Sequence, residues 1–255
     1  MIAKFKQILR RLKYDSRLLV KGIRIRLTVT PPTDLKQIPI VINNYNQLDF
    51  LIVLIDSLRK RGYHNIHILD NDSTYPPLLE FYRNTDLNVI RLKENFGHLS
   101  FWKSGVYKQF EHNYFVYTDP DLEIVEECPD DFMEVFFNLM QKYPKSSKVG
   151  FALKIDDLPD CFVKKEEVIN WEKRFWENEV EENVFGAPID TTFALYRPFT
   201  RGGSNSMEYP MRVGGKYVMR HLPWYIDSKN LSENMEYYVN SCRKNATHWG
   251  ERVKG

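Results

Sequence analysis

Residues 114–121 read Tyr-Phe-Val-Tyr-Thr-Asp-Pro-Asp, an apolar run that ends in two carboxylates separated by one proline. An apolar run rich in aromatic and β-branched residues predicts a buried strand over 114–117. Asp119 and Asp121 then stand where that strand emerges, so their side chains can share a divalent cation. Carboxylate oxygens suit Mg²⁺ or Mn²⁺, and both ions bridge diphosphate oxygens well. The stretch therefore predicts a metal site at the end of a buried strand.

Three further strand patterns precede this run, and helical patterns separate them. Four strands with helices between them predict a parallel sheet in an α/β fold. In such sheets ligands bind beyond the carboxyl ends of the strands, which is where Asp119 stands. The expected strands are 38–42, 66–69, 87–92 and 114–117, and the expected helices are 48–58, 76–82 and 99–110.

Four short motifs stand in the order and spacing of a known enzyme family. Residues 40–46 read Ile-Val-Ile-Asn-Asn-Tyr-Asn, 69–74 Leu-Asp-Asn-Asp-Ser-Thr, 94–98 Glu-Asn-Phe-Gly-His and 119–121 Asp-Pro-Asp. Together they resemble the first turn, the base-binding turn, the Asn-x-Gly turn and the metal motif of GT-A glycosyltransferases, closest to the inverting family two. The resemblance covers roughly residues 37–125. It implies a Rossmann-like nucleotide-diphospho-sugar transferase fold, with a mostly parallel mixed sheet flanked by helices.

The resemblance also implies which side chains hold the donor, a sugar carried by a nucleoside diphosphate, with UDP as the expected carrier. The first turn borders the nucleoside, the acidic turn binds the base edge, and the third turn approaches the ribose or diphosphate. The expected donor-binding residues are Asn43, Asn44, Tyr45, Asp70, Asn71, Asp72, Asn95, His98, Lys103 and Asp119. A turn stabilised by its own Asp and Asn side chains is the competing explanation for residues 70–73.

The implied reaction transfers the sugar to a hydroxyl of a glycan or lipid-linked acceptor, in cell-surface polysaccharide or lipopolysaccharide synthesis. An inverting transferase needs a carboxylate to take the proton from that hydroxyl. The second half of the chain lacks the family's Gln-x-x-Arg-Trp signature, but Asp190 follows a Gly-Ala-Pro turn and precedes an apolar run. We expect Asp190 to be the base, unless it caps a turn or positions the acceptor. Glu208 and Asp227 are weaker candidates.

A third metal ligand is expected late in the chain, because the resemblance implies one and neutral imidazole suits Mn²⁺ beside two carboxylates. His221 follows a short strand-like run and is the expected ligand, with His248 as the runner-up. A histidine that only packs in the structure is the alternative. The predicted metal ligands are therefore Asp119, Asp121 and His221, and the predicted metal is Mn²⁺ or Mg²⁺.

The N-terminal segment differs in character from the rest of the chain. Residues 2–13 place apolar side chains at steps of three and four among lysines and arginines, which predicts a basic amphipathic helix. Such a helix suits an anionic membrane surface; packing on this domain or on a second subunit is the alternative. We expect residues 1–30 to form this helix and tail. One domain should follow at 36–250, with a nucleotide-sugar half at 36–125 and an acceptor half at 126–250.

The acceptor half carries weaker patterns. A charged insert with large aromatics over 156–182 is a candidate lid or acceptor loop, unless its aromatics pack inward. Four glycines in residues 200–216 predict a flexible loop. The expected helices here are 132–142 and 231–242, and the expected strands are 149–153 and 191–196.

Composition narrows the function classes further. The 255-residue chain has a net charge of only +2, but residues 1–26 hold nine basic side chains and one acidic one, so the body is acidic. An acidic body argues against nucleic acid as the main partner. Three scattered cysteines show no disulfide or zinc spacing. With no pattern of a spanning helix or signal peptide, we expect a cytoplasmic protein, peripheral at the inner face of the membrane.

Other classes share parts of this pattern. Haloacid-dehalogenase-like phosphatases place Asp-x-Asp near the start of the domain, with Thr or Val two residues later, where this chain has Glu123. Sugar-phosphate nucleotidyltransferases carry a Gly-rich basic loop in the first turn, which residues 43–45 lack. A non-catalytic sugar- or nucleotide-binding module on the same fold is a further alternative.

Overall fold

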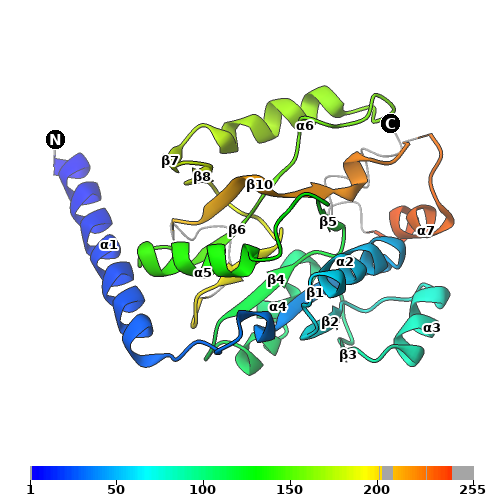
Figure 1. The fold of residues 1–255 in the computed structure, drawn as a ribbon, viewed down its shortest axis with the longest axis horizontal. Coiled ribbons are helices and arrows are strands. Elements are labelled where there is room, and N and C mark those ends of the chain that lie inside the picture. The colour runs from blue at the N-terminus through cyan, green and yellow to red at the C-terminus, as the bar shows by residue number, and fades with distance from the viewer. Residues whose placement is uncertain (1, 201, 203–208, 228, 243–255) are drawn as a thin grey trace.

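The computed structural model describes residues 2–200, 202, 209–227 and 229–242, and one mixed sheet runs through these residues (Figure 1). Its strands follow the apolar runs of the sequence. They are β1 Ile40–Asn44, β2 Ile66–Asp70, β3 Asn88–Arg91, β4 Phe115–Thr118, β5 Leu122–Ile124, β6 Lys148–Leu153, β7 Glu179–Glu181, β8 Val184–Phe185, β9 Ala194–Tyr196 and β10 Met211–His221.

The order of the strands is β3-β2-β1-β4-β9-β6-β10-β8-β7, and β5 pairs with β10 off this path. The first four strands in this order are parallel to one another, and β6 and β10 are parallel to each other. Strand β9 runs antiparallel between β4 and β6. The predicted α/β fold, with a mostly parallel mixed sheet, is confirmed.

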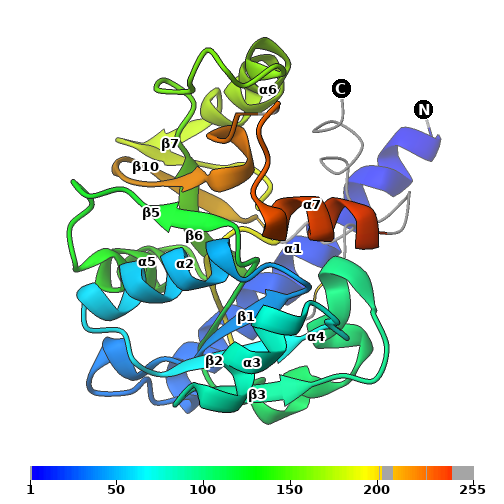
Figure 2. The ribbon, with the colours of Figure 1, turned by 90° about the vertical axis from the view of Figure 1, so that its right-hand side faces the viewer.

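Helices flank the sheet on both faces, as Figure 1 and Figure 2 show. They are α1 Ile2–Thr28, α2 Asp49–Lys60, α3 Pro76–Asn84, α4 Ser100–Lys103, α5 Phe132–Lys142, α6 Lys165–Glu172 and α7 Glu233–Ser241. Alternate residues of β1 point to opposite faces. Ile40 and Ile42 belong to the core with α2 and α5, and Val41 belongs to a second core with Phe101 of α4. Burial on both faces explains why β1 reads as a continuous apolar run.

The helix predicted over 99–110 is wrong in its extent. Helix α4 ends at Lys103, and only a short 3₁₀ turn over Val106–Gln109 follows it. Gly105 lies between the two with a φ of +82°, a left-handed conformation that ends an α-helix. The predicted apolar face exists, because Phe101 and Val106 are both buried. Gly105 nevertheless ends the α-helix between these two residues.

The flexible loop predicted over 200–216 is wrong from Met211 onward, where β10 begins. The pairing of β10 with β6 shifts register between Val213 and Val218. Gly215 has a φ of +62°, and a side chain at Gly214 would clash with the Trp176 ring. These two glycines allow an irregular stretch inside a strand. A loop was predicted because the number of glycines alone does not distinguish such a stretch from a loop.

The charged insert over 156–182 contains α6, a 3₁₀ turn over Lys173–Trp176 and the edge strand β7. Its aromatic side chains divide between the two predicted roles. Trp176 packs inward against Phe185, with ring centroids 5.2 Å apart. Trp171 is exposed, and the Arg174 guanidinium stacks on its ring. Of the insert's aromatic side chains, Trp171 is the exposed one and stays available for contact with another molecule.

Helix α1 begins with the predicted basic segment but continues to Thr28, well beyond residue 13. Its second half packs on the domain. Ile25 is buried, Gly22 lies against the Pro144 carbonyl, and Lys21 donates to the Phe199 carbonyl at 2.9 Å. None of the described helices combines the length and apolar character that crossing a membrane requires.

Replacing Gly22 with alanine should loosen α1, although alanine favours a helix by about 1 kcal/mol over glycine. The added Cβ would overlap the Pro144 carbonyl, whose backbone cannot move aside easily. We expect faster tryptic cleavage within α1 for Gly22→Ala. Ser16→Ala, on the exposed side of the same helix, should cleave at the wild-type rate or more slowly. Equal rates for Gly22→Ala and Ser16→Ala would contradict the packing described.

Candidate active site

The order of the strands places a topological switch point between β1 and β4. After β1 the chain adds β2 and β3 on one side, and then returns to place β4 on the other side. At such a switch point the connections leave in opposite directions, so a ligand-binding crevice is expected outside the carboxyl ends of the two strands. Asn43 and Asn44 end β1, and Asp119 directly follows β4. The sequence-predicted first turn and metal motif therefore meet at one place.

Asp119 is held by hydrogen bonds from a distant part of the chain. Its backbone N–H donates to the Thr191 carbonyl at 2.8 Å, and the Thr191 hydroxyl donates to the Asp119 carboxylate. The Asn43 side chain also hydrogen-bonds the Asp119 carboxylate. Because β9 pairs with β4 in an antiparallel manner, the segment before β9 lies beside the end of β4. These contacts fix the orientation of the first carboxylate of the Asp-x-Asp motif.

Burial raises the pKa of Asp119 well above its ordinary value. The negative charges of Asp121 and Asp190 raise this pKa further, whereas the hydrogen bonds from Thr191 and Asn43 lower it. Repulsion of this kind shows that the carboxylates lie within electrostatic reach of one another. A cation at this place would relieve it.

Asp121 and His221 lie side by side, although 100 residues separate them in the sequence. Strand β5 directly follows Asp121 and pairs with β10, so that His221 stands opposite Leu122. The distance from His221 Nε2 to Asp121 Oδ2 is 3.4 Å, and the two side chains are only 11% and 15% exposed. The Leu222 N–H also donates to the Asp121 carbonyl, at 2.9 Å. The sheet thus brings together two of the three predicted metal ligands.

These residues fit a divalent cation that is shared with a phosphate group. Within the described part of the chain, no three His, Cys, Asp or Glu side chains converge closely enough to hold a metal by themselves. Mg²⁺ usually needs only one or two carboxylates, because substrate phosphates and water complete its octahedral shell. The pair Asp121–His221, with Asp119 nearby, suits such an arrangement. Their role as ligands remains a prediction.

The predicted base-binding turn is tied mainly to the protein itself. Asp70 is fully buried; its carboxylate pairs with Arg91 at 3.1 Å and accepts from the Ser73 N–H at 3.2 Å. Asn71 accepts from the Phe96 N–H at 2.9 Å and donates to Asn95 Oδ1 at 3.0 Å. The competing explanation, a turn stabilised by its own side chains, therefore describes much of what Asp70 and Asn71 do.

Asp72 differs from its two neighbours in being exposed. Its φ of +69° places it in the left-handed region, which aspartate tolerates better than most residues. This backbone conformation keeps Asp72 outside the network formed by Asp70 and Asn71. Of the three residues, Asp72 is the one whose carboxylate faces the solvent.

The first turn contributes both buried and partly exposed groups. Asn43 Oδ1 accepts from the Ser100 hydroxyl at 2.6 Å, and Asn44 donates to the Tyr82 hydroxyl at 2.8 Å. Tyr45 is partly exposed, and its hydroxyl donates to the Ser241 carbonyl at 3.2 Å. Asn44 is fully buried, which makes it a group that positions its neighbours rather than one open to a ligand.

The third turn lies beside the second, since Asn71 binds both Asn95 and the Gly97 carbonyl. His98 and Lys103 are exposed, and Lys103 Nζ donates to the Phe96 carbonyl at 3.3 Å. Lys103 therefore reaches back over this turn, and its contact with a donor phosphate remains a prediction.

Asp190 lies within the electrostatic reach of Asp119 and is exposed. The side chain of Lys148 holds the preceding backbone, because its Nζ donates to the Ile189 and Asp190 carbonyls. Asp227 instead accepts from the Lys229 N–H in a local turn. The alternates Glu208 and His248 lie outside the described residues. Of the described candidates for the base, Asp190 is the one shown to be close to the metal motif.

Two residues that organise the site carry little signal in the sequence. Asn46 is buried with a φ of +53°, and its side chain accepts from the Thr74 and Tyr75 N–H groups. Asn234 of α7 donates to the Asn46 carbonyl and accepts from the Leu48 N–H. An asparagine tolerant of positive φ was a usable hint at Asn46. The contact from α7 joins positions 188 residues apart, so only the fold reveals it.

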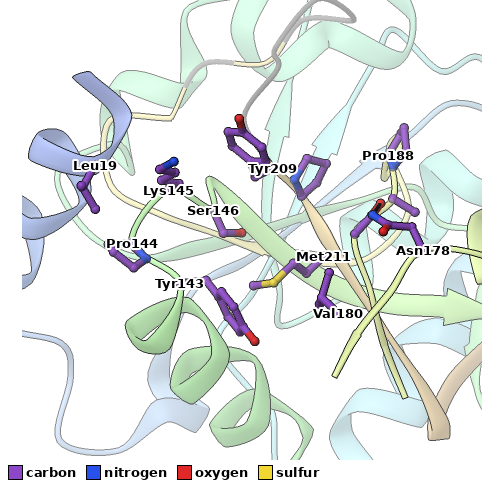
Figure 3. Close-up of a pocket in the computed structure, with 13 residues that line it drawn as sticks. Leu19, Tyr143, Pro144, Lys145, Ser146, Asn178, Val180, Pro188, Tyr209 and Met211 are labelled. Atoms are coloured by element: carbon purple, nitrogen blue, oxygen red, sulfur yellow. Dashed lines mark hydrogen bonds between the residues drawn. The ribbon is translucent and has the colours of Figure 1, made fainter. Parts of the chain in front are cut away.

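An apolar cavity of about 370 Å³ lies away from this site (Figure 3). Its walls include Tyr143 and Pro144, which precede β6, and Pro210 and Met211 at the start of β10. Strands β4, β6 and β10 run in the same direction, and Asp119 follows β4 whereas His221 ends β10. The cavity therefore lies at the opposite ends of these strands from Asp119 and His221, and its wall also includes Pro188, two residues before Asp190.

A model of the family described as Glycosyl transferase family 2 matches residues 40–197, more than half of the chain. The chain belongs to glycosyl transferase family 2. The predicted family, its GT-A fold and the enzyme class of glycosyltransferase are thereby confirmed. The matched range includes Asp119, Asp121 and Asp190 but ends before His221. No curated protein matches the chain.

Solved structures similar to this family-two chain share little of its sequence. S. aureus TarS 1–349 is 14% identical over 85% of this chain and 69% of its own, with a TM-score of 0.43. GalNAc-T7 with UDP, GalNAc and Mn²⁺ is 14% identical over 72% of this chain and 43% of its own, with a TM-score of 0.44. Glucosyl-3-phosphoglycerate synthase from Mycobacterium tuberculosis with phosphoglyceric acid is 14% identical over 63% of this chain and 56% of its own, with a TM-score of 0.39. The chain spans about half the length of the last two.

Replacing Asp119 with asparagine should stabilise the protein in metal-free buffer at neutral pH. A buried carboxyl whose pKa is raised in the folded state costs stability as the pH rises above its unfolded value. Removing that charge should add on the order of 1 kcal/mol or more to the free energy of unfolding. The gain should shrink as the pH falls toward about 4, where the unfolded carboxyl is protonated too.

Thermal unfolding with a chelator, measured across this pH range, tests the prediction. Asp156→Asn is the matched control, because Asp156 is an exposed carboxylate outside the site. An Asp119→Asn variant that melts lower than wild type at neutral pH would contradict the unfavourable burial of this charge.

Proposed function

We propose that this family-two protein transfers a sugar from a nucleoside diphosphate, with UDP as the expected carrier, to an acceptor hydroxyl. The observation that carries the proposal is the meeting of Asp119, Asp121 and His221 beside the switch point between β1 and β4. Clustered carboxylates at a switch point suit a metal-bound diphosphate better than they suit a neutral ligand. The same cluster argues against a purely structural module, since it is costly without a cation.

Asp121 and His221 would hold Mn²⁺ or Mg²⁺, with Asp119 directed to the same place. The ion would supply positive charge that stabilises the departing nucleoside diphosphate. Thr191 and Asn43 keep the Asp119 carboxylate oriented for this role. The protein's own contribution is thus to present carboxylates whose mutual repulsion favours cation binding.

The donor nucleoside would lie along the first and second turns. Asp72 is exposed and suits the base edge, whereas Asp70 and Asn71 hold the turn in shape. Tyr45 stands at the partly open end of the first turn, next to the buried Asn43 and Asn44. Further along the expected crevice, Asn95, His98 and Lys103 would approach the ribose or diphosphate. The exposed lysine offers a positive charge suited to a phosphate oxygen.

Asp190 would act as the general base that takes the proton from the acceptor hydroxyl, giving an inverting displacement. Its exposure leaves the carboxylate accessible to an acceptor, and Lys148 restrains its backbone. The acceptor would be a glycan or a lipid-linked precursor in cell-surface polysaccharide or lipopolysaccharide synthesis. The basic helix α1 is the feature that supports a cytoplasmic location at the membrane surface.

Calorimetric titration with UDP and a panel of other nucleoside diphosphates, with and without Mn²⁺, tests the donor site first. We expect UDP binding that requires Mn²⁺ in the wild type. For Asp121→Ala we expect a loss exceeding the roughly 10- to 100-fold cost that is typical of outer-shell changes. Asp156→Ala, at an exposed carboxylate, should bind as wild type does. If no nucleoside diphosphate binds in either condition, the non-catalytic alternative replaces the proposal.

Asp190→Asn tests the proposed base. Loss of a general base should lower turnover by about 10²- to 10⁴-fold while Mn²⁺-dependent UDP binding stays intact. Release of UDP from a UDP-sugar in the presence of acceptor is the measurement. Glu182→Gln, at an exposed carboxylate in the preceding turn, is the control and should turn over normally. Near-normal turnover of Asp190→Asn would remove Asp190 as the base.

A further inference from the structure

Helix α1 has two different faces. One face packs on the domain through Gly22 and Ile25, and through Asp15, which accepts from the Tyr209 hydroxyl at 2.7 Å. The N-terminal half stands clear of the domain, as the blue helix in Figure 1 and Figure 2 shows. The packed face is set by these contacts in the second half of the helix.

The helix also carries a second, exposed apolar stripe, and residues 4–13 are exposed on every side of the helix. At 100° per residue, Leu27 is turned about 160° away from the buried Ile25. Phe5 near the start of the helix is 62% exposed, and Leu27 near its end is 78% exposed. The exposed apolar residues, at steps of one, three, four and eight, are Phe5, Ile8, Leu9, Leu12, Val20, Ile23 and Leu27. A stripe of this length on a helix of about 40 Å marks a binding surface.

The charges beside this stripe indicate which partner fits it. Cationic side chains flank the stripe, including Lys6, Lys13, Arg17 and Arg24, all exposed. Asp15 is the only carboxylate within residues 2–28, and it faces the domain, 3.8 Å from Lys145. At 100° per residue these four cations lie within about 40° of one another, so they line one flank of the stripe. An antiparallel second copy would bring these like charges together, which disfavours a dimer through this face. Anionic lipid headgroups would neutralise the cations instead.

We propose that the outer face of α1, from Phe5 to Leu27, lies in the plane of an anionic lipid bilayer. The apolar side chains would enter the boundary of the acyl region, and the flanking cations would contact lipid phosphates. The apolar cavity of Figure 3 adjoins this face, because its wall includes Leu19, four residues from Ile23. The surface next to the helix is thus apolar as well, which suits contact with lipid.

This placement also orients the candidate active site. Helix α1 contacts Pro144, Phe199 and Tyr209, which lie just before β6, just after β9 and just before β10. Asp121 and His221 lie at the opposite ends of these strands. A strand of five residues is roughly 17 Å long, so the two places are at least about that far apart. The site therefore opens away from the bilayer. An acceptor hydroxyl that stands off from the lipid headgroups would fit this geometry.

Co-sedimentation of the full chain with vesicles, without nucleotide, tests the proposal independently of sugar transfer. We expect binding to vesicles of phosphatidylcholine and phosphatidylglycerol in equal parts, weakened by salt, and little binding to phosphatidylcholine alone. Ile23→Asp and Leu27→Asp should each weaken binding at least about tenfold, as should Phe5→Asp. Val163→Asp is the matched control, an exposed apolar residue elsewhere on the protein, and should bind as wild type does.

The variants change exposed side chains, so circular dichroism should show wild-type folding for each. Binding that Ile23→Asp and Leu27→Asp leave unchanged would overturn the whole-length docking face. Equal binding to neutral and anionic vesicles would overturn the role of the cations. A dimer in light scattering that Leu27→Asp converts to monomer would assign the stripe to a second copy instead.

Discussion

The pair of hydrogen bonds between Asp119 and Thr191 is the contact on which the rest of the site depends. It joins the carboxyl end of β4 to the segment that enters β9, two parts of the chain 72 residues apart. Without this connection the motif Asp-Pro-Asp would be a loop at the end of a strand. With it, the segment that carries Asp190 is held beside the motif, and the second half of the sheet meets the first.

The same contact concentrates negative charge at a place poor in water. Burial and the neighbouring carboxylates raise the pKa of Asp119, and two hydrogen-bond donors only partly offset this effect. A protein that stabilised this edge for its own sake would not place three aspartates there. Without a cation the site is therefore locally unfavourable for stability, and such local instability is typical of functional sites.

The molecule separates its two candidate surfaces across the sheet. The carboxyl ends of β4 and β10 carry the acidic site, whereas the opposite edge carries the basic helix α1. This separation explains the uneven charge of the chain. Nucleotide binding and lipid binding would use opposite ends of the parallel strands, so each surface keeps the charge that its ligand requires.

The sequence by itself determined the strands of the first half and the positions of the polar turns that follow them. Apolar runs that end in Asp or Asn, such as 114–119, are local signals, because a strand buried on both faces must be apolar throughout. The sequence determined the ends of helices and strands less well. Gly105 divides a predicted helix, and Gly214 and Gly215 lie inside a strand, since a glycine marks an unusual conformation without naming it.

Only the tertiary structure decided which polar residues meet. Thr191 on Asp119, Asn234 on Asn46 and His221 beside Asp121 all result from strand pairing or helix docking between distant segments. The tertiary structure also decided which polar groups make internal contacts. The motif Asp-Asn-Asp is polar throughout in the sequence, but only Asp72 is exposed in the structure. The exposed stripe of α1 is likewise defined by the tertiary structure, because the domain covers Gly22 and Ile25 and leaves Ile23 and Leu27 exposed. Local patterns determine which residues are polar or apolar, but packing determines which of them remain accessible.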